Sequence, residues 1–205
     1  MRSPLINTES DNVFNKNALL ELFIKEEIMN EIPNKDASLG DKKDNRLFLT
    51  SKQKFALALV EYVKPTHFIT LSLNQARRIG DQYRGTWARG DDAVYSDTHD
   101  GFMQSLSKRL CSRTVWEFHR PILRSACVVE GGRKGVRNHL HMIVAKPDDV
   151  DEEKFRIMAI RTAANNAWIM NGPHAVNIQQ IADNMEAINA AYYCVKQGLE
   201  RLTLS

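Results

Sequence analysis

The sequence is poor in cysteine and lacks long apolar runs. Its three cysteines, Cys111, Cys127 and Cys194, are odd in number and show no Cys-x-x-Cys spacing. This pattern argues against a disulfide framework or a zinc knuckle and favours reduced thiols. No apolar stretch reaches membrane-spanning length, and the first residues lack the apolar segment of a signal peptide. We therefore expect a cytoplasmic protein with no membrane partner.

Charge is unevenly distributed along the 205 residues, a length that favours one domain with a substantial core. Residues 1–45 contain 6 Lys/Arg and 9 Asp/Glu, a balance of −3, and residues 46–205 contain 22 and 16, a balance of +6. Within residues 108–137, 8 basic side chains accompany 2 acidic ones. The local excess predicts a polyanionic partner such as nucleic acid, although a solvated basic face gives the same pattern.

Residues 126–146 carry the most informative pattern in the chain. Two apolar, β-branched runs flank a basic loop that contains glycine, which predicts a β-hairpin. Side chains two apart on a strand share a face, so His139 and His141 point the same way. Glu130 ends the first strand beside the start of the second. Two imidazoles and a carboxylate can therefore converge as ligands of a divalent metal, with a merely polar strand face as the alternative.

The other patterns predict an α+β protein. We expect helices over residues 17–32, 51–63, 101–119, 147–170 and 183–198, with Ser51 as a possible cap, and further strands over 67–74 and 175–181. Residues 75–100 show no strong period, which indicates an irregular excursion.

From residue 66 the order of expected elements is β-α-β-β-α-β-α. This order predicts a ferredoxin-like or RRM-like antiparallel sheet with helices on one face and an open face for nucleic acid. We expect residues 1–46 to form a helical or disordered extension and residues 47–205 to form the main domain.

The last expected helix carries two adjacent tyrosines. Apolar residues recur along it at three- and four-residue steps and predict a buried stripe: Met185, Ile188, Tyr192, Val195 and Leu199. Tyr193 lies about 100° further round, on a polar side that includes Lys196. A phenol is a poor nucleophile until its oxygen is deprotonated or hydrogen-bonded, and a nearby ammonium favours the phenolate. Tyr193 and Lys196 are therefore candidate catalytic residues, although Tyr-x-x-Lys is frequent by chance.

Three stretches, taken in order, resemble the motifs of the HUH endonucleases: Phe68-Ile-Thr-Leu-Ser-Leu, His139-Leu-His141 and Tyr193-Cys-Val-Lys196. This superfamily comprises rolling-circle replication initiators, relaxases and some transposases. Only one tyrosine fits the Tyr-x-x-Lys motif, so the chain resembles the single-tyrosine replication initiators (Rep proteins). The resemblance covers residues 66–200. The sequence has no P-loop motif, so we expect no helicase domain in it, and residues 1–65 have no counterpart in the family.

The resemblance implies a nickase and strand transferase for single-stranded DNA. Glu130, His139 and His141 would hold Mg²⁺ or Mn²⁺, and Tyr193 would attack phosphorus, displace a 3′-hydroxyl and remain as a 5′-phosphotyrosine. Lys196 would steady the phosphate or the phenolate. The substrate would be single-stranded DNA or an origin hairpin of a plasmid or phage in a bacterial or archaeal cell, with a host helicase as partner. Four residues are candidate DNA contacts: Thr70, Arg133, Lys134 and Arg137.

Three other interpretations stay open. A non-catalytic nucleic-acid-binding module would stack bases on sheet aromatics, of which Phe68 is the main one. A metal hydrolase that uses water as the nucleophile would need no Tyr193. Within the HUH superfamily, a relaxase or transposase is the alternative to a replication initiator. The remaining histidines of the domain (His67, His99, His119 and His174) are not part of these motifs, and we expect His67, His119 and His174 to be structural or solvent-facing.

Overall fold

The computed structural model describes residues 50–79, 86–131, 137–196 and 201–205. The chain divides into two compact units, Met1–Lys54 and Phe55–Ser205. The account below concerns the second unit and the first turn of the helix that leads into it. The expected helix over residues 17–32 and the expected extension over residues 1–46 lie outside the described residues.

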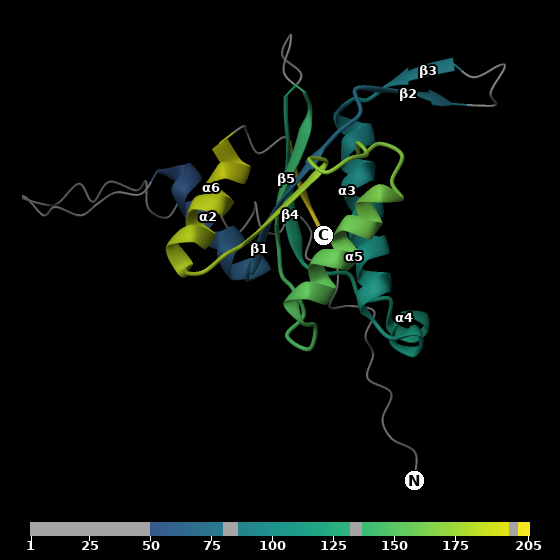
Figure 1. Ribbon diagram of the computed structural model, residues 1–205. Helices are drawn as coiled ribbons and strands as arrows, with labels where there is room; N and C mark the ends of the chain where they lie inside the picture. Colours follow the sequence, from purple (N-terminus) through teal and green to yellow (C-terminus); the bar gives the residue numbers. More distant parts are fainter. Residues whose placement is uncertain (1–49, 80–85, 132–136, 197–200) are drawn as a thin grey trace, which may run out of the picture. The chain divides into compact units, whose positions relative to one another are not determined.

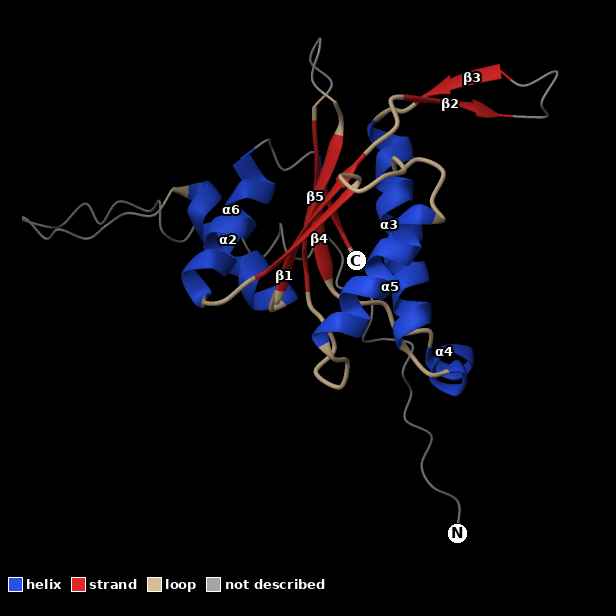
Figure 2. Ribbon diagram, in the orientation of Figure 1, coloured by secondary structure: helices blue, strands red, loops and turns tan. Residues whose placement is uncertain are grey.

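A five-stranded antiparallel sheet forms the centre of this unit (Figures 1 and 2). Its strands are β1 (His67–Ser72), β4 (Ser125–Glu130), β5 (His139–Val144), β6 (Val176–Gln180) and β7 (Leu202–Leu204). They lie in the order β6-β1-β5-β4-β7, and each neighbouring pair is antiparallel. The prediction of an α+β fold with an antiparallel sheet is confirmed, and the 126–146 hairpin forms the pair β4–β5.

Helices cover both faces of the sheet, whereas the sequence predicted helices on one face. Figure 1 shows α3 (Asp92–Leu110) and α5 (Glu152–Ala164) on one side and α2 (Ser51–Val63) and α6 (Asn184–Lys196) on the other. The one-sided prediction was wrong because β4 and β5 bury side chains on both of their faces, and each buried face needs a packed layer. No helix within the described ranges is long and apolar enough to cross a membrane.

The main hydrophobic core lies between the sheet and the helices α3 and α5. Alternate residues of β1, β5 and β4 point into it, as the strand period requires. The buried strand residues on this face are Ile69, Leu71, Cys127, Val129, Leu140, Met142 and Val144. Tyr95 and Phe102 of α3 and Phe155 of α5 fill the space above them.

Two helices begin at side-chain caps that were not predicted, although α2 has the expected bounds. Thr50 and Gln53 form a capping box: the Gln53 N–H donates to Thr50 Oγ1 at 3.3 Å and the Thr50 N–H donates to Gln53 Oε1 at 2.8 Å. The cap of α2 is therefore Thr50 and not Ser51. Asp91 caps α3 by accepting from the Val94 N–H at 2.9 Å, so α3 starts before residue 101. It ends at Leu110, and residues Arg113–His119 form the separate helix α4.

Residues 75–100 are more regular than the sequence indicated. The strands β2 (Ala76–Ile79) and β3 (Thr86–Arg89) form a second, two-stranded antiparallel sheet, which we call the ribbon. Figure 1 shows the ribbon projecting beyond the end of the main sheet. Strands of 4 residues are too short for their alternation to stand out in a sequence.

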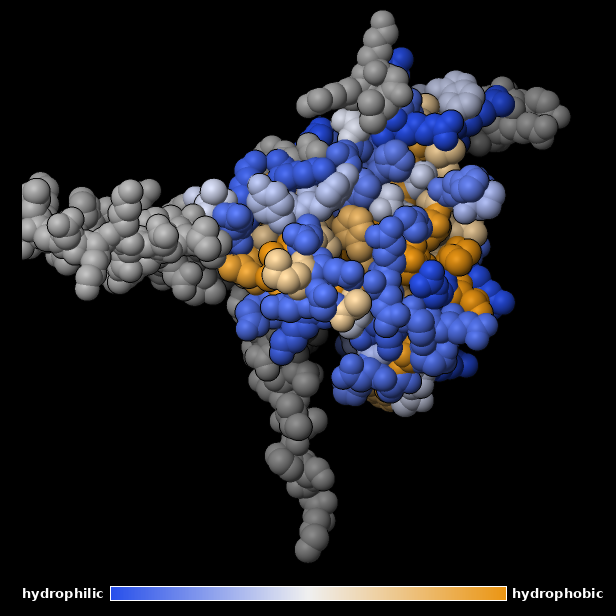
Figure 3. Space-filling model, turned by 60° about the vertical axis from the view of Figure 1, so that its left-hand side comes forward, coloured by the Kyte–Doolittle hydropathy of each residue, from blue (hydrophilic) through white to orange (hydrophobic). Residues whose placement is uncertain are grey.

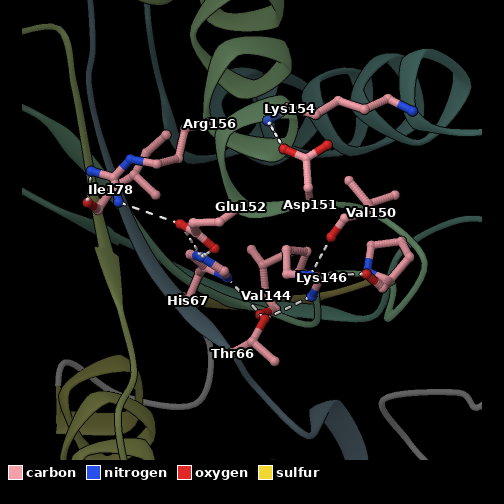
Figure 4. A network of polar contacts seen from close by, with 11 residues as sticks. Thr66, His67, Val144, Lys146, Val150, Asp151, Glu152, Lys154, Arg156 and Ile178 are labelled. Atoms are coloured by element: carbon pink, nitrogen blue, oxygen red, sulfur yellow. Dashed lines mark hydrogen bonds and ion pairs between the residues drawn. The ribbon is translucent and has the colours of Figure 1, made fainter.

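A buried polar network joins the start of β1 to α5 (Figure 4). His67 is fully buried, and its Nε2 lies 3.0 Å and 2.9 Å from the two carboxylate oxygens of Glu152. Its Nδ1 lies 2.8 Å from Thr66 Oγ1, which also accepts the Lys146 N–H at 2.8 Å. These contacts satisfy a buried imidazole and fix the first turn of α5 on the sheet. His67 therefore has a structural role. It is the first residue of β1, and Ser72 is the last.

Glu152→Gln tests this network. Burial alone raises the pKa of Glu152, but His67 and Arg156 outweigh it and lower the pKa below its ordinary value of 4.5. A lowered folded-state pKa stabilises the protein fully above the unfolded-state pKa, and this stabilisation is lost as the pH falls through the folded-state value. The carboxylate is 36% exposed, so we expect a loss of only about 1 kcal/mol in the free energy of unfolding at neutral pH.

Urea unfolding at neutral pH and near pH 4 measures this effect, and the deficit of Glu152→Gln should shrink at the lower pH. The exposed neighbour Glu153 supplies the matched control, Glu153→Gln, which should unfold like the unchanged protein at both values. A deficit that is the same at both pH values would contradict the role given to the Glu152 carboxylate.

Candidate functional site

The predicted site residues gather where β4 ends and β5 begins. Glu130 is the last residue of β4 and lies opposite His139, the first residue of β5. His139 also lies opposite Ser72, the last residue of β1. The strand alternation places Glu130, His139 and His141 on the face of the sheet that α6 covers. The register therefore brings the three predicted metal ligands to one end and one face of the sheet.

The carboxylate of Glu130 contacts three side chains. Tyr193 Oη donates a hydrogen bond to Glu130 Oε2, and His141 Nε2 lies 2.9 Å from the same oxygen. Lys196 Nζ lies 3.8 Å from Glu130 Oε1. Both catalytic residues predicted from α6 therefore meet the carboxylate predicted as a metal ligand.

Aromatic contacts orient the rings around this carboxylate. Phe68 lies nearly parallel to His141, with 5.8 Å between ring centroids, and meets Tyr193 edge-on at 5.8 Å. Tyr193 also meets His141 edge-on at 4.9 Å. The Lys196 ammonium lies 3.3 Å from the centroid of the Tyr193 ring, which is a cation–π contact. These contacts restrict the rotamers of the rings and hold the Tyr193 hydroxyl toward Glu130.

Thr70 orients His141. Its Oγ1 lies 3.0 Å from His141 Nδ1, and the His141 side chain is only 11% exposed. His141 Nε2 is buried and makes no well-directed hydrogen bond to a residue of the described part, although Glu130 Oε2 is close. With the proton assigned to Nδ1, the lone pair of Nε2 faces the carboxylate, and this is a donor pair that suits a cation. The predicted DNA contact of Thr70 stays a prediction.

The pKa values describe a site in which the phenol of Tyr193, the candidate nucleophile, is protonated. Burial raises the pKa of Glu130, but Tyr193, His141 and Lys196 outweigh it and lower the pKa below 4.5, so the carboxylate is ionised at neutral pH. Burial lowers the pKa of His141 below 6.5, which favours the neutral imidazole that binds metals. Burial and the hydrogen bond to Glu130 raise the pKa of Tyr193 to about 12, so its phenol keeps the proton.

The donor set fits a divalent cation, although the ligands are not gathered around one point. Across the described ranges, no three His, Cys, Asp or Glu side chains form a ready group of metal ligands. Glu130 and His141 already approach each other, and the His139 ring lies 5.9 Å from the His141 ring between centroids. A carboxylate and two imidazoles, one of them with a buried Nε2 that lies 2.9 Å from that carboxylate, are the ligand types that Mn²⁺ or Mg²⁺ would use.

The buried stripe of α6 differs from the predicted one. The buried residues are Ala187, Ala191, Cys194 and Val195, whereas Met185 is 63% and Tyr192 40% exposed. The prediction that Tyr192 is a core residue was wrong. Small side chains let the helix lie close to the sheet, and Cys194 Sγ is 3.8 Å from the carbonyl oxygen of His141. Tyr193, on the edge of this stripe, consequently reaches Glu130.

The predicted DNA-binding arginines and lysine are only partly described. Arg133 and Lys134 lie outside the described residues, and Arg137 is exposed just before β5. The described basic residues of the stretch 108–137 do not all lie beside the candidate site. Arg113 is paired with Glu117 within α4 at 2.7 Å, and Figure 1 shows α4 at the other end of the sheet from the place where β4 ends and β5 begins.

A cleft of about 500 Å³ beside Tyr193 was not predicted from the sequence. It lies between the edge strand β6 and α6, and its size is that of a small-ligand site. Its lining includes Phe68, Gln179, Gln180, Glu186, Asn189 and Tyr193. Part of this lining could have been predicted from strand alternation, because Gln179 lies opposite Phe68 on the neighbouring strand and shares its face.

Comparisons with protein families, with curated proteins and with solved structures find no match for this chain. The function is therefore inferred from the chemistry of the site and from the resemblance of its motifs.

Gly131 fixes the chain direction directly after Glu130. Its φ is +124°, and an added Cβ would lie 2.5 Å from Asn138 Oδ1 and 2.7 Å from the Arg137 carbonyl oxygen. We expect Gly131→Ala to lower the free energy of unfolding by about 2 kcal/mol. Gly101→Ala on α3, which meets nothing within 4 Å, should raise it by about 0.5–1 kcal/mol. Denaturant unfolding followed by circular dichroism measures the free energy of unfolding of both variants. An unchanged value in Gly131→Ala would contradict the role of Gly131 in fixing the chain direction.

Proposed function

We propose that this protein is a metal-dependent endonuclease that nicks single-stranded DNA and rejoins it through a tyrosine. The observation that carries the proposal is the hydrogen bond from Tyr193 to Glu130, the carboxylate that also meets His141. A tyrosine hydroxyl beside a donor set that suits Mg²⁺ or Mn²⁺ supports phosphodiester transfer with Tyr193 as the nucleophile. The order of the three motifs, which resembles that of the HUH endonucleases, supports the same conclusion.

Tyr193 is the nucleophile in the proposed reaction. Its Oη forms a bond to phosphorus, the bond from phosphorus to the 3′-oxygen breaks, and the leaving 3′-oxygen becomes a hydroxyl by taking up the one proton that the phenol gives up. The phenolic proton points at Glu130 Oε2, its acceptor in the structure. Attack by a DNA 3′-hydroxyl on the 5′-phosphotyrosine reverses these steps and rejoins the strand. The tyrosine ester conserves the phosphodiester energy, so the cycle consumes no nucleotide cofactor.

Glu130, His139 and His141 would hold the metal, and Thr70 fixes the ring of His141. When bound, Mg²⁺ or Mn²⁺ supplies a Lewis acid that neutralises charge on the scissile phosphate. Lys196, over the Tyr193 ring and near Glu130, is placed to stabilise the phenolate or the phosphate. The side chains thus supply a nucleophile, its orientation and a cationic environment.

The cleft beside Tyr193 supports a substrate with accessible bases. Its aromatic rings, Phe68 and Tyr193, and its amides, Gln179 and Asn189, suit stacking and hydrogen bonding to an unpaired base next to the scissile phosphate. This favours a single strand or the unpaired part of an origin hairpin. We assign the activity to rolling-circle replication of a plasmid or phage in a bacterial or archaeal cytoplasm, with a host helicase separating the strands.

The nucleophile is tested with end-labelled single-stranded oligonucleotides and Mn²⁺, from a randomised pool or from DNA that flanks the coding sequence. The unchanged protein should form an adduct that survives a denaturing gel. Tyr193→Phe should reduce adduct formation by at least about 1,000-fold, because the phenylalanine ring keeps the stacking but has no nucleophilic oxygen. Oligonucleotide binding should persist.

Tyr192→Phe is the matched control, because it removes the same atom from the adjacent, exposed residue. It should form adduct within about twofold of the unchanged protein. Adduct formation that requires Tyr192 instead of Tyr193 would contradict the assignment. Metal-dependent cleavage that survives Tyr193→Phe would instead identify a nuclease that uses water.

Thr70→Val tests how the site holds the metal. Valine keeps the shape of threonine but leaves His141 Nδ1 without its partner, so the ring is no longer fixed in one tautomer and orientation. We expect Mn²⁺ to bind about 10-fold or more weakly. Titration followed by electron paramagnetic resonance measures free Mn²⁺ directly. Ser72→Ala is the control on the same strand face, since its hydroxyl bonds the His174 carbonyl; equal losses in both variants would contradict the role of Thr70.

A further inference from the structure

The ribbon presents a row of cationic and aromatic side chains on one face. Arg78 and Trp87 lie directly opposite each other across β2 and β3. Arg89 is two residues beyond Trp87 and opposite the small Ala76, so it shares their face. The exposed indole therefore has one arginine opposite it on β2 and another two residues along β3. Trp87 is 73% exposed, and both arginines are exposed.

The other face of the ribbon is held by the domain. The Arg77 guanidinium lies over the Trp168 ring, 5.6 Å from its centroid. At the base, the Gly90 N–H donates to the Gln75 carbonyl at 3.0 Å, and a Cβ added to Gly90 would overlap the Tyr95 hydroxyl. Because one face is anchored in this way, the face that bears Trp87 is directed away from the anchor.

The two acidic residues that follow the ribbon in the chain contact other partners. The Asp91 carboxylate accepts the Val94 N–H as the cap of α3, and Asp92 pairs with Arg201 at 3.3 Å. Among the described residues of β2 and β3 there are three arginines and no acidic side chain. Figure 3 shows hydrophilic surface at the upper right, the end from which the ribbon projects. The positive charge of the ribbon's arginines fits a polyanionic partner.

The arrangement of one exposed aromatic with two arginines on the same face favours an unpaired strand. Every base has a π-face that can stack on an indole, but a base inside a duplex does not expose it. Guanidinium groups bind phosphates with two donors each, so the two arginines suit the phosphates on either side of a stacked base. The ribbon also begins four residues after Ser72, which lies opposite His139. It therefore leaves the main sheet at the end that carries the candidate site.

We propose that the ribbon is a second nucleic-acid-binding site, at which an unpaired strand stacks a base on Trp87 and places phosphates on Arg78 and Arg89. This site is separate from Tyr193 and Glu130, and it binds whether or not Tyr193 nicks DNA. A strand held there is retained near the end of the sheet at which β1, β4 and β5 meet the candidate site.

The test is fluorescence anisotropy of a labelled single strand of about 20 nucleotides, long enough for a typical single-strand site. The full chain is used, with EDTA present so that metal-dependent chemistry cannot contribute. Trp87→Ala should weaken binding about tenfold, and Trp87→Phe should keep most of the affinity because phenylalanine still stacks. In the double variant Arg78→Ala/Arg89→Ala, the slope of log K against log salt should fall by about 1.4, or about 0.7 per phosphate contact.

Two controls match these variants elsewhere on the surface. Phe118→Ala removes an aromatic ring that is 77% exposed on α4, and Arg161→Ala removes an exposed arginine of α5. Both should bind within about twofold of the unchanged protein, and circular dichroism checks that every variant is folded. Loss of affinity in Trp87→Ala, with the salt slope unchanged, supports stacking at the ribbon.

Three results would overturn the proposal. The first is an unchanged affinity in Trp87→Ala, and the second is an equal loss in Phe118→Ala. The third is a loss for Trp87→Ala that is as large on a fully paired duplex as on the single strand. Because nicking is blocked in this experiment, a failed nicking assay leaves the result intact, and a failed binding test leaves the assignment of Tyr193 intact.

Discussion

The Glu130 carboxylate, with its contacts to Tyr193, His141 and Lys196, is the interaction on which the candidate site depends. A partly buried carboxylate must be compensated by donors or cations, and here the compensating groups come from two elements, β5 and α6. β4 carries the carboxylate, β5 the imidazole, and α6 the phenol and the ammonium. These contacts require the register of β4 with β5 and the close approach of α6. The same contacts keep Tyr193 protonated until the environment of Glu130 changes.

The two faces of the sheet serve different purposes. The face under α3 and α5 is apolar and supplies most of the core. The face under α6 combines buried apolar residues with His139, His141, Glu130 and Thr70. It opens into the cleft beside Tyr193. The small residues Ala187 and Ala191 hold α6 close to this face. A rigid sheet thus positions polar groups that an irregular loop would hold less closely.

The parts of the fold with a clear period were predictable from the sequence. The β4–β5 hairpin, β1 and the start of the last helix follow from strand alternation, glycine and proline signals and helical spacing. The phase of α6 did not follow, because spacing rules favour large apolar residues such as Met185 and Tyr192. Packing against a sheet instead selected small ones, so Ala187, Ala191 and Cys194 are buried together with Val195, the one buried residue of α6 that the spacing had predicted. The ribbon and β7 were missed because strands of 3 or 4 residues carry too little pattern.

The residues of the candidate site could be predicted from the sequence, but the contacts among them could not. Register and alternation placed Glu130 beside His139, and the Tyr-x-x-Lys spacing selected Tyr193. No sequence rule showed that the Tyr193 hydroxyl reaches Glu130, that Thr70 meets His141, or that Phe68 stacks on His141. Each of these contacts joins elements far apart in the chain, and its geometry is set by packing.

The most direct test of the central claim is to identify the residue that DNA becomes joined to. Trypsin should release the peptide Thr162–Lys196, which contains both tyrosines of α6, from protein incubated with Mn²⁺ and a cleavable oligonucleotide. After nuclease digestion, fragmentation mass spectrometry should find a nucleotide phosphate on Tyr193. A nucleotide on Tyr192 or on another residue, or cleaved oligonucleotide with no modified peptide, would contradict the account.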